Sequence, residues 1–274
     1  MPSGGEVVHL VSDDRGEMRI LRLGRRLRIE CSSTGDFLLD PQAGVATVWA
    51  ATDNDEALEH RLASLVLPVM LSERGDTALH ASGVLCGGLT VALAGPSGAG
   101  KSTLAGASAL PVVSEDGLVL TRSPAGFECW PGPLGVRLLP DAMDSFTQPD
   151  DAPARPPGAL KARLEVPAVR AATPLAGIVF IEPRRTPGQD LKPPVRVKPV
   201  EAVPDLLRSQ IFAGTDRTGD AFHRAARLAD GVPVWRVSMP NGLDRLRDAF
   251  EQMLSGIGLD RSRTAPASQA SAEN

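Results

Sequence analysis

The chain is poor in aromatic residues, which make up 4% of its 274 residues, and it has no tyrosine at all. Hydrophobic residues of all kinds still reach 42%, so we predict a core of aliphatic side chains. The length suits one large domain or two small ones. The sequence also has no apolar run long enough to cross a bilayer, and its first 25 residues lack an apolar signal region. These absences argue against insertion into a membrane.

Cysteine is scarce, and the chain carries little excess charge. Cys31, Cys86 and Cys129 are odd in number and do not have the spacing of metal ligands. We interpret them as reduced thiols of a cytoplasmic protein. The formal net charge is −4, so no strongly basic face is expected. This balance argues against a protein that binds nucleic acid.

Against this plain background, residues 95–103 carry the strongest motif, Gly-Pro-Ser-Gly-Ala-Gly-Lys-Ser-Thr, which matches G-x-x-x-x-G-K-[ST]. In such a P-loop, successive backbone N–H groups turn inward toward a polyphosphate, and glycines stand where a side chain would block it. Lys101 supplies a positive charge for the phosphates, and the Ser102 hydroxyl can bind Mg²⁺. We therefore predict an ATP site that is contacted by Gly95, Pro96, Ser97, Gly98, Ala99, Gly100, Lys101, Ser102 and Thr103.

The flanking sequence provides the context that this motif needs. Residues 89–94 are apolar and predict a buried strand that runs into the loop, and residues 103–110 predict a helix. Gly87-Gly88 is a hairpin signal. The strand before the loop is therefore expected to be the second arm of a hairpin whose first arm starts near His80.

The rest of the chain falls into three predicted parts. Residues 1–75 predict a small β-rich region followed by an amphipathic helix over 53–72, residues 76–260 the nucleotide-binding domain, and residues 261–274 a disordered tail. Proline-rich loops at 148–158 and 183–194 are either lids or plain surface loops. Strands are predicted at 7–11, 18–23, 27–30, 45–49, 112–116, 118–120, 134–139, 175–181 and 232–237, and further helices at 202–229 and 243–254.

Two acidic residues, Glu115 and Asp116, end the strand that follows the predicted P-loop helix. In an open α/β sheet, that strand end faces the same crevice as the P-loop. One carboxylate there can orient Mg²⁺, while the other accepts the proton of an attacking hydroxyl.

These segments resemble one known family. His80-Ala-Ser-Gly-Val, the 95–104 loop and Val113-Ser-Glu-Asp116 are together similar to the core of HPr kinase/phosphorylase, firmly over about 79–120 and more weakly to 181. The resemblance implies an α/β fold with a P-loop kinase core similar to HPr kinase and phosphoenolpyruvate carboxykinase, here preceded by the small β-rich region. Family members transfer phosphate from ATP to a protein serine, and smaller relatives phosphorylate precursor peptides.

The resemblance also implies roles for individual residues. Lys101 would bind phosphate, Asp116 would be the base that takes the serine proton, and His80 would sit beside it and tune its charge. Ser102, Glu115 and Asp141 would be the Mg²⁺ ligands. The usual Asp-Asp pair of the family is Glu115-Asp116 in this chain, and the glycine-rich signature of the bifunctional enzymes is missing. This argues against the reverse, phosphorylase reaction and against HPr as substrate.

The predicted function is that of an ATP-dependent serine kinase, acting on a Ser or Thr hydroxyl of a protein or peptide; a homo-oligomer is possible within the family. Two alternatives stay open. One is a nucleotide-dependent regulatory or binding protein with little turnover, and the glutamate at position 115 in place of the usual aspartate supports this alternative. The other is a small-molecule phosphotransferase.

Overall fold

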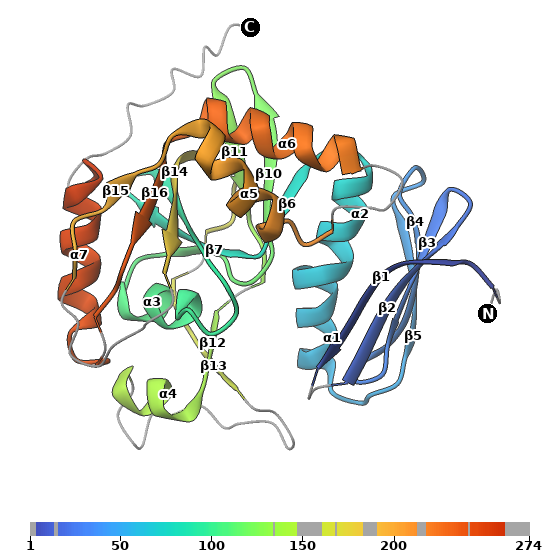
Figure 1. Ribbon diagram of the computed structural model, residues 1–274. Helices are drawn as coiled ribbons and strands as arrows, with labels where there is room; N and C mark the ends of the chain where they lie inside the picture. Colours follow the sequence, from blue (N-terminus) through green and yellow to red (C-terminus); the bar gives the residue numbers. More distant parts are fainter. Residues whose placement is uncertain are drawn as a thin grey trace, which may run out of the picture.

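The computed structural model describes residues 4–13, 16–133, 135–146, 161–167, 169–182, 191–212, 218–240 and 242–260. It is a mixed α/β structure with a small sheet, a large sheet, a two-stranded ribbon, and helices between and around them (Figure 1). The predicted tail 261–274, the loop 148–158 and residues 183–190 of the second loop lie outside the described residues. No helix in the described part is both long and apolar enough to span a bilayer.

The N-terminal part is an antiparallel sheet of five strands paired in chain order. They are β1 (Glu6–Asp13), β2 (Gly16–Leu23), β3 (Arg26–Cys31), β4 (Gly35–Asp40) and β5 (Val45–Ala50). The predicted strands at 7–11, 18–23, 27–30 and 45–49 are confirmed. The prediction missed β4, whose acidic residues disfavour a strand. Here Asp36 pairs with Arg28 of the neighbouring strand at 2.8 Å, which compensates for that preference.

A helical segment follows this sheet and lies between it and the larger sheet (Figure 1). It consists of α1 (Asp55–Arg61), the π-helical turn η1 (Leu62–Val66) and α2 (Leu67–Glu73). The side chain of Asn54 caps it by accepting a hydrogen bond from the N–H of Ala57 at 3.0 Å. Its apolar face packs on the small sheet, while α2 also contacts strands of the large one. The single helix predicted over 53–72 is thus confirmed, apart from the π-helical turn.

The larger sheet is ordered β6-β10-β11-β14-β8-β7-β9, with β16 and then β15 attached beside β14. Strand β7 is antiparallel to both β8 and β9, while β14 is parallel to β8 and to β16. The carboxyl ends of β8, β9, β14 and β16 therefore lie at one edge. The bounds are β6 (Thr77–Leu79), β7 (Ala81–Cys86), β8 (Leu89–Ala94), β9 (Val112–Ser114), β10 (Leu118–Ser123), β11 (Gly126–Trp130), β14 (Thr173–Ile181), β15 (Val195–Arg196) and β16 (Val234–Val237).

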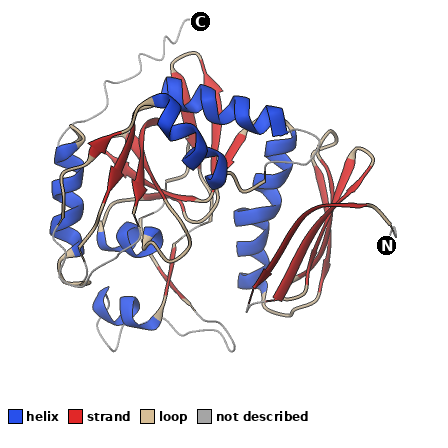
Figure 2. Ribbon diagram, viewed as in Figure 1, coloured by secondary structure: helices blue, strands red, loops and turns tan. Residues whose placement is uncertain are grey.

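Helices cover both faces of the large sheet (Figure 2). α3 (Lys101–Ala107) and α7 (Leu246–Gly256) share one apolar cluster, and α5 (Pro199–Ser209) and α6 (Thr218–Gly231) share the other. A separate ribbon of β12 (Val136–Leu138) and β13 (Ala162–Leu164) lies near α4 (Pro140–Phe146).

The prediction of one helix over 202–229 is wrong. Helix α5 ends at Ser209, because the next residues pair with strand β6 instead of continuing the helix. Gln210 forms a β-bridge with Leu79, and the N–H of Ile211 donates to the carbonyl of Ala78 at 3.0 Å. The hairpin expected around Gly87-Gly88 is confirmed as β7 and β8.

Candidate active site

The glycine-rich segment forms the loop that joins β8 to α3, so the predicted order of strand, loop and helix is present. Gly95, Gly98 and Gly100 all have positive φ angles, of +143°, +78° and +96°. A Cβ atom at Gly95 would lie 2.6 Å from the carbonyl oxygen of Ile181. Only glycine therefore lets the loop pass so close to the end of β14, whereas a Cβ at Gly98 would meet nothing within 4 Å.

The backbone of this loop is open to an anion. Among the described residues, the N–H groups of Ser97, Gly98 and Gly100 donate no hydrogen bond within the protein. Lys101 is buried, and its Nζ donates to the carbonyls of Gly95 and Pro96 at 3.0 and 3.2 Å. Burial lowers the pKa of Lys101. Free N–H groups and a lysine at one loop are the donors that suit phosphate oxygens.

Glu115 links the acidic pair to the loop. It follows β9, is only 2% exposed, and its Oε1 accepts a hydrogen bond from the Ser102 hydroxyl at 2.7 Å. Burial and then the neighbouring charge of Asp116 raise the pKa of Glu115 to about 7. A hydroxyl and a carboxylate in contact fit Mg²⁺, which takes few protein oxygens and completes its shell with phosphates and waters.

Asp116 lies in an uncommon backbone conformation. Its φ is +72°, and the N–H of Gly117 donates to the carbonyl of Glu115 at 2.9 Å across it. These features describe a γ-turn of the rare, positive-φ kind. Strained conformations of this kind cluster at functional sites. From this turn, the Asp116 carboxylate contacts His80.

His80 lies next to Asp116, as the resemblance implies. Its Nδ1 is 3.1 Å from Oδ1 of Asp116, and its backbone N–H donates to the carbonyl of Ser209 at 2.7 Å. Burial lowers the pKa of His80, although the charge of Asp116 acts in the opposite direction. The neutral ring can therefore donate a hydrogen bond to Asp116 and fix its orientation.

A second histidine, which the sequence analysis missed, lies at the same carboxylate. Nε2 of His60, on α1, is 4.0 Å from Oδ2 of Asp116. Burial and the nearby Arg137 lower the pKa of His60 to about 4. The amphipathic pattern of residues 53–72 predicts only an apolar face that packs on the core, and His60 is not on that face. The available signal was the rarity of histidine, of which the chain has four.

The helical segment is seated tightly against the γ-turn. A Cβ atom at Gly117 would lie 2.7 Å from the carbonyl oxygen of Ser64 in η1. The turn that carries Asp116 is therefore in direct contact with the π-helical turn, and π-helical turns are frequent at functional sites. This contact holds α1, and with it His60, beside the acidic pair.

The structure does not bring Asp141 together with the other predicted ligands. Asp141 is exposed in the first turn of α4, and no hydrogen bond or ion pair joins it to Ser102 or Glu115. Among the described residues, no group of three or more His, Cys, Asp or Glu side chains is placed to hold a metal ion.

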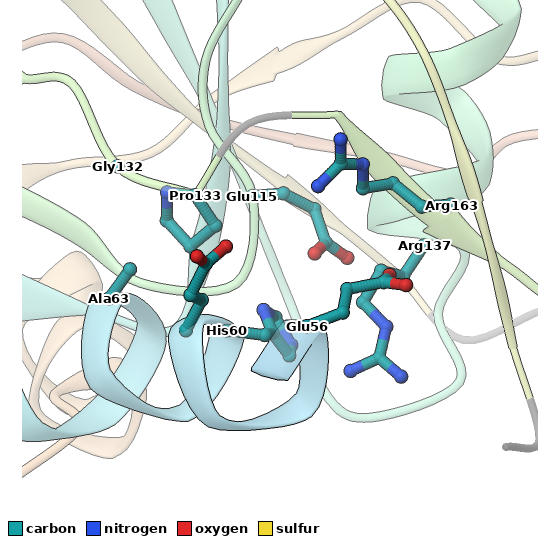
Figure 3. A pocket seen from close by; sticks show the side chains of 9 residues that line it. Glu56, His60, Ala63, Glu115, Gly132, Pro133, Arg137 and Arg163 are labelled. Carbon is teal, nitrogen blue, oxygen red and sulfur yellow. The ribbon is translucent and has the colours of Figure 1, made fainter. Parts of the chain in front are cut away.

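A cavity of about 210 Å³ opens beside Glu115 (Figure 3). One wall comes from α1, with Glu56, Glu59 and His60, and another from the β12–β13 ribbon, with Arg137 and Arg163. Glu115 thus faces both the glycine-rich loop, through Ser102, and this cavity.

Comparison with known proteins adds one distant structural similarity. No family model matches the chain, and no curated protein matches it. Among solved structures, the Hpr(Ser) kinase/phosphatase from Coxiella burnetii is similar at 15% identity over 63% of this chain and 91% of that one, with a TM-score of 0.32. This is a distant structural relationship, and it assigns no function to the chain.

Proposed function

We propose that this protein is an ATP-dependent kinase that transfers the terminal phosphate to a Ser or Thr hydroxyl of a protein or peptide. One observation carries the proposal. The open glycine-rich loop, the Ser102–Glu115 pair and the His80–Asp116 pair lie together at the carboxyl ends of β8 and β9. A phosphate site, a metal-binding pair and a base in one place are the parts that phosphoryl transfer needs.

The loop and its neighbours would hold the nucleotide and the metal. The free N–H groups of Ser97, Gly98 and Gly100 and the ammonium of Lys101 would bind the phosphate oxygens. Ser102 and Glu115 would hold Mg²⁺, which neutralises charge on those oxygens. Because the pKa of Glu115 is about 7, this role requires the carboxyl group to lose its proton when the ion binds.

Asp116 would act on the acceptor. As the hydroxyl oxygen forms its bond to the terminal phosphorus and the bond to the leaving oxygen breaks, the hydroxyl proton passes to the Asp116 carboxylate. His80 would hold one oxygen of that carboxylate, which leaves the other directed to the side where His60 lies. Most of the acceleration would come from this positioning and from charge neutralisation.

The test is transfer of label from [γ-³²P]ATP to peptides and to proteins of a cell extract. Label on Ser or Thr is expected with the wild-type chain. It is expected to disappear with Lys101→Ala, and to fall at least ~100-fold with Asp116→Asn while nucleotide affinity stays within about 2-fold. Asp144→Asn, an exposed carboxylate on α4, is the matched control.

Other outcomes would overturn the proposal. Nucleotide binding without transfer to any peptide or protein would identify a regulatory protein. Transfer to small alcohols alone would identify a small-molecule phosphotransferase. Undiminished transfer in Asp116→Asn would remove this residue as the base.

A further inference from the structure

Two arginines stand side by side on the wall of the cavity beside Glu115. Arg137 of β12 and Arg163 of β13 are direct partners in the antiparallel ribbon, and both line the cavity (Figure 3). Directly opposed residues on such a ribbon point to the same face, with Cβ atoms roughly 5 Å apart. Two like charges in this arrangement repel each other and destabilise the ribbon.

No described carboxylate lies within ion-pair distance of either arginine, and the only described attraction on the pair is the longer-range electrostatic interaction between Arg137 and Glu115. No ion pair or hydrogen bond is formed by either guanidinium with a described residue, and Nε of Arg137 is buried without a hydrogen-bond partner. Lys161, just before β13, adds to the positive charge, and it is near enough to lower the pKa of Lys101. Buried donors without partners are rare in proteins, and at the wall of a cavity they indicate a missing acceptor.

The opposite wall carries the other sign. Glu56 and Glu59 of α1 line the cavity. Glu115 lies between the two walls (Figure 3). None of these carboxylates reaches the arginines within ion-pair distance. A triphosphate in this cavity would bring several negative charges against three carboxylates. One carboxylate or phosphate group, placed against the arginines, matches the cavity much better.

We propose that the cavity binds an anionic group of the phosphate acceptor, a carboxylate or a phosphate carried close to the hydroxyl, through Arg137 and Arg163. This inference rests on the proposed kinase function. The cavity touches Glu115, and its His60 lies 4.0 Å from Asp116, so an acceptor anchored here has its hydroxyl beside the base. The carboxylates of Glu56 and Glu59 on α1 accept hydrogen bonds from N–H groups of the same acceptor.

The first experiment measures anion binding without nucleotide. Inorganic phosphate and N-acetyl-aspartate amide are titrated into the full chain by calorimetry. Saturable binding in the range of ~10 mM or tighter is expected for the wild type. The dissociation constant is expected to rise at least ~10-fold in Arg137→Gln and in Arg163→Gln, because the bidentate partner is lost.

Two further variants make this result specific. Arg122→Gln, an exposed arginine on β10, is the matched control and should bind as the wild type does. Lys101→Ala removes the phosphate donor of the glycine-rich loop and should leave binding of the aspartate probe unchanged. The proposal is overturned if the wild type binds neither probe saturably. It is also overturned if binding of the aspartate probe falls in Lys101→Ala but not in Arg137→Gln or Arg163→Gln. Far-ultraviolet circular dichroism checks that each variant is folded.

The second experiment asks whether the anion belongs to the acceptor. Serine peptides with Asp, Glu, phosphoserine or Ala beside the acceptor are compared as substrates. Acidic peptides are expected to react at least ~10-fold faster than the Ala peptide, and Arg163→Gln should remove this preference at unchanged nucleotide affinity. The ranking of Asp and Glu against phosphoserine distinguishes a carboxylate from a phosphate.

The two experiments separate failure of this inference from failure of the proposed function. Arginine-dependent probe binding without any phosphate transfer would support the anion site and contradict the kinase function. Phosphate transfer without a preference for acidic peptides would support the kinase function and contradict the anion site. A loss of nucleotide affinity in both arginine variants would show that the cavity serves the nucleotide instead.

Discussion

Nδ1 of His80 lies 3.1 Å from Oδ1 of Asp116, and each residue is held in place by its own backbone. The N–H of His80 is bonded to the carbonyl of Ser209 at 2.7 Å, while Asp116 stands at the centre of a γ-turn. The backbone therefore fixes where both side chains start, and only rotation of the two side chains can change the contact. It gives the carboxylate a fixed orientation toward whatever binds at the end of the glycine-rich loop.

This contact predicts different results for two substitutions of His80. His80→Ala removes the ring nitrogen that lies 3.1 Å from the Asp116 carboxylate, so we expect phosphate transfer to fall about 10- to 100-fold. His80→Asn keeps an N–H donor near the position of Nδ1 and should retain most of the activity. Rates of label transfer at saturating nucleotide provide the measurement, and equal losses in both variants would show that the donor is not what matters.

The pH profile gives a second readout of the same contact. Because burial lowers the pKa of His80, the ring gains a proton only below its ordinary range, and the cation would then weaken Asp116 as a base. Transfer by the wild type should therefore decline on acidification. The asparagine variant does not titrate at this position, so its acid limb should be displaced from that of the wild type.

The γ-turn predicts a conflict between stability and activity at Asp116. Its φ of +72° suits glycine, whereas a residue with Cβ pays for this conformation. We expect Asp116→Gly to be more stable than Asp116→Ala by on the order of 1 kcal/mol, although both lose phosphate transfer. Urea unfolding of the two variants measures the difference. A less stable glycine variant would contradict the strain that we assign to the turn.

The buried Glu115 predicts a stability that depends on pH. Its pKa is about 7 in the folded protein, against an ordinary value of 4.5, so the folded state holds this proton more tightly than the unfolded state. The stabilisation is complete below pH 4.5 and is lost as the pH rises to 7. The glutamine in Glu115→Gln cannot ionise. Without divalent cations, the free energy of unfolding of this variant should exceed that of the wild type above pH 7 by up to about 3 kcal/mol.

Two comparisons control this prediction. The gain should shrink to near zero toward pH 4.5, where Glu115 is protonated in both states of the wild type. The exposed Glu165→Gln should show no such trend. His60 titrates in an overlapping range with the opposite sign, since its folded pKa is lowered to about 4, but it is common to all three proteins and cancels in the differences.

The close approach of Gly117 to η1 predicts a steric effect. A Cβ there would lie 2.7 Å from the carbonyl oxygen of Ser64, so Gly117→Ala must push the γ-turn away from the helical segment. We expect a loss of about 1–3 kcal/mol in the free energy of unfolding, together with a loss of phosphate transfer. Gly219→Ala, where a Cβ meets nothing within 4 Å, is the control and should be nearly neutral.

The sequence alone was sufficient for features that depend on neighbouring residues. The loop from Gly95 to Ser102 could be placed between a strand and a helix, because glycine spacing and apolar runs are local signals. The hairpin at Gly87-Gly88 and most strands of the small sheet followed for the same reason. Strand β4 did not, because its acidic residues disfavour a strand and are compensated by Arg28 on the neighbouring strand. The break after Ser209 did not, because it depends on pairing with Ala78, which is distant in the sequence.

In the candidate site, too, some features follow from the sequence and others only from the tertiary structure. Lys101, Ser102, Glu115, Asp116 and His80 could all be selected as candidates from motif and resemblance. The resemblance already predicted His80 beside Asp116, and the structure places the two side chains 3.1 Å apart. The hydrogen bond from Ser102 to Glu115 became visible only when β7, β8 and β9 were assembled into one sheet. For His60 the sequence offered only the rarity of histidine, and the two arginines that face each other across the β12–β13 ribbon left no pattern in the sequence. The sequence determines which side chains are available, whereas long-range packing decides which of them meet, because the cost of burying charge depends on neighbours that are remote along the chain.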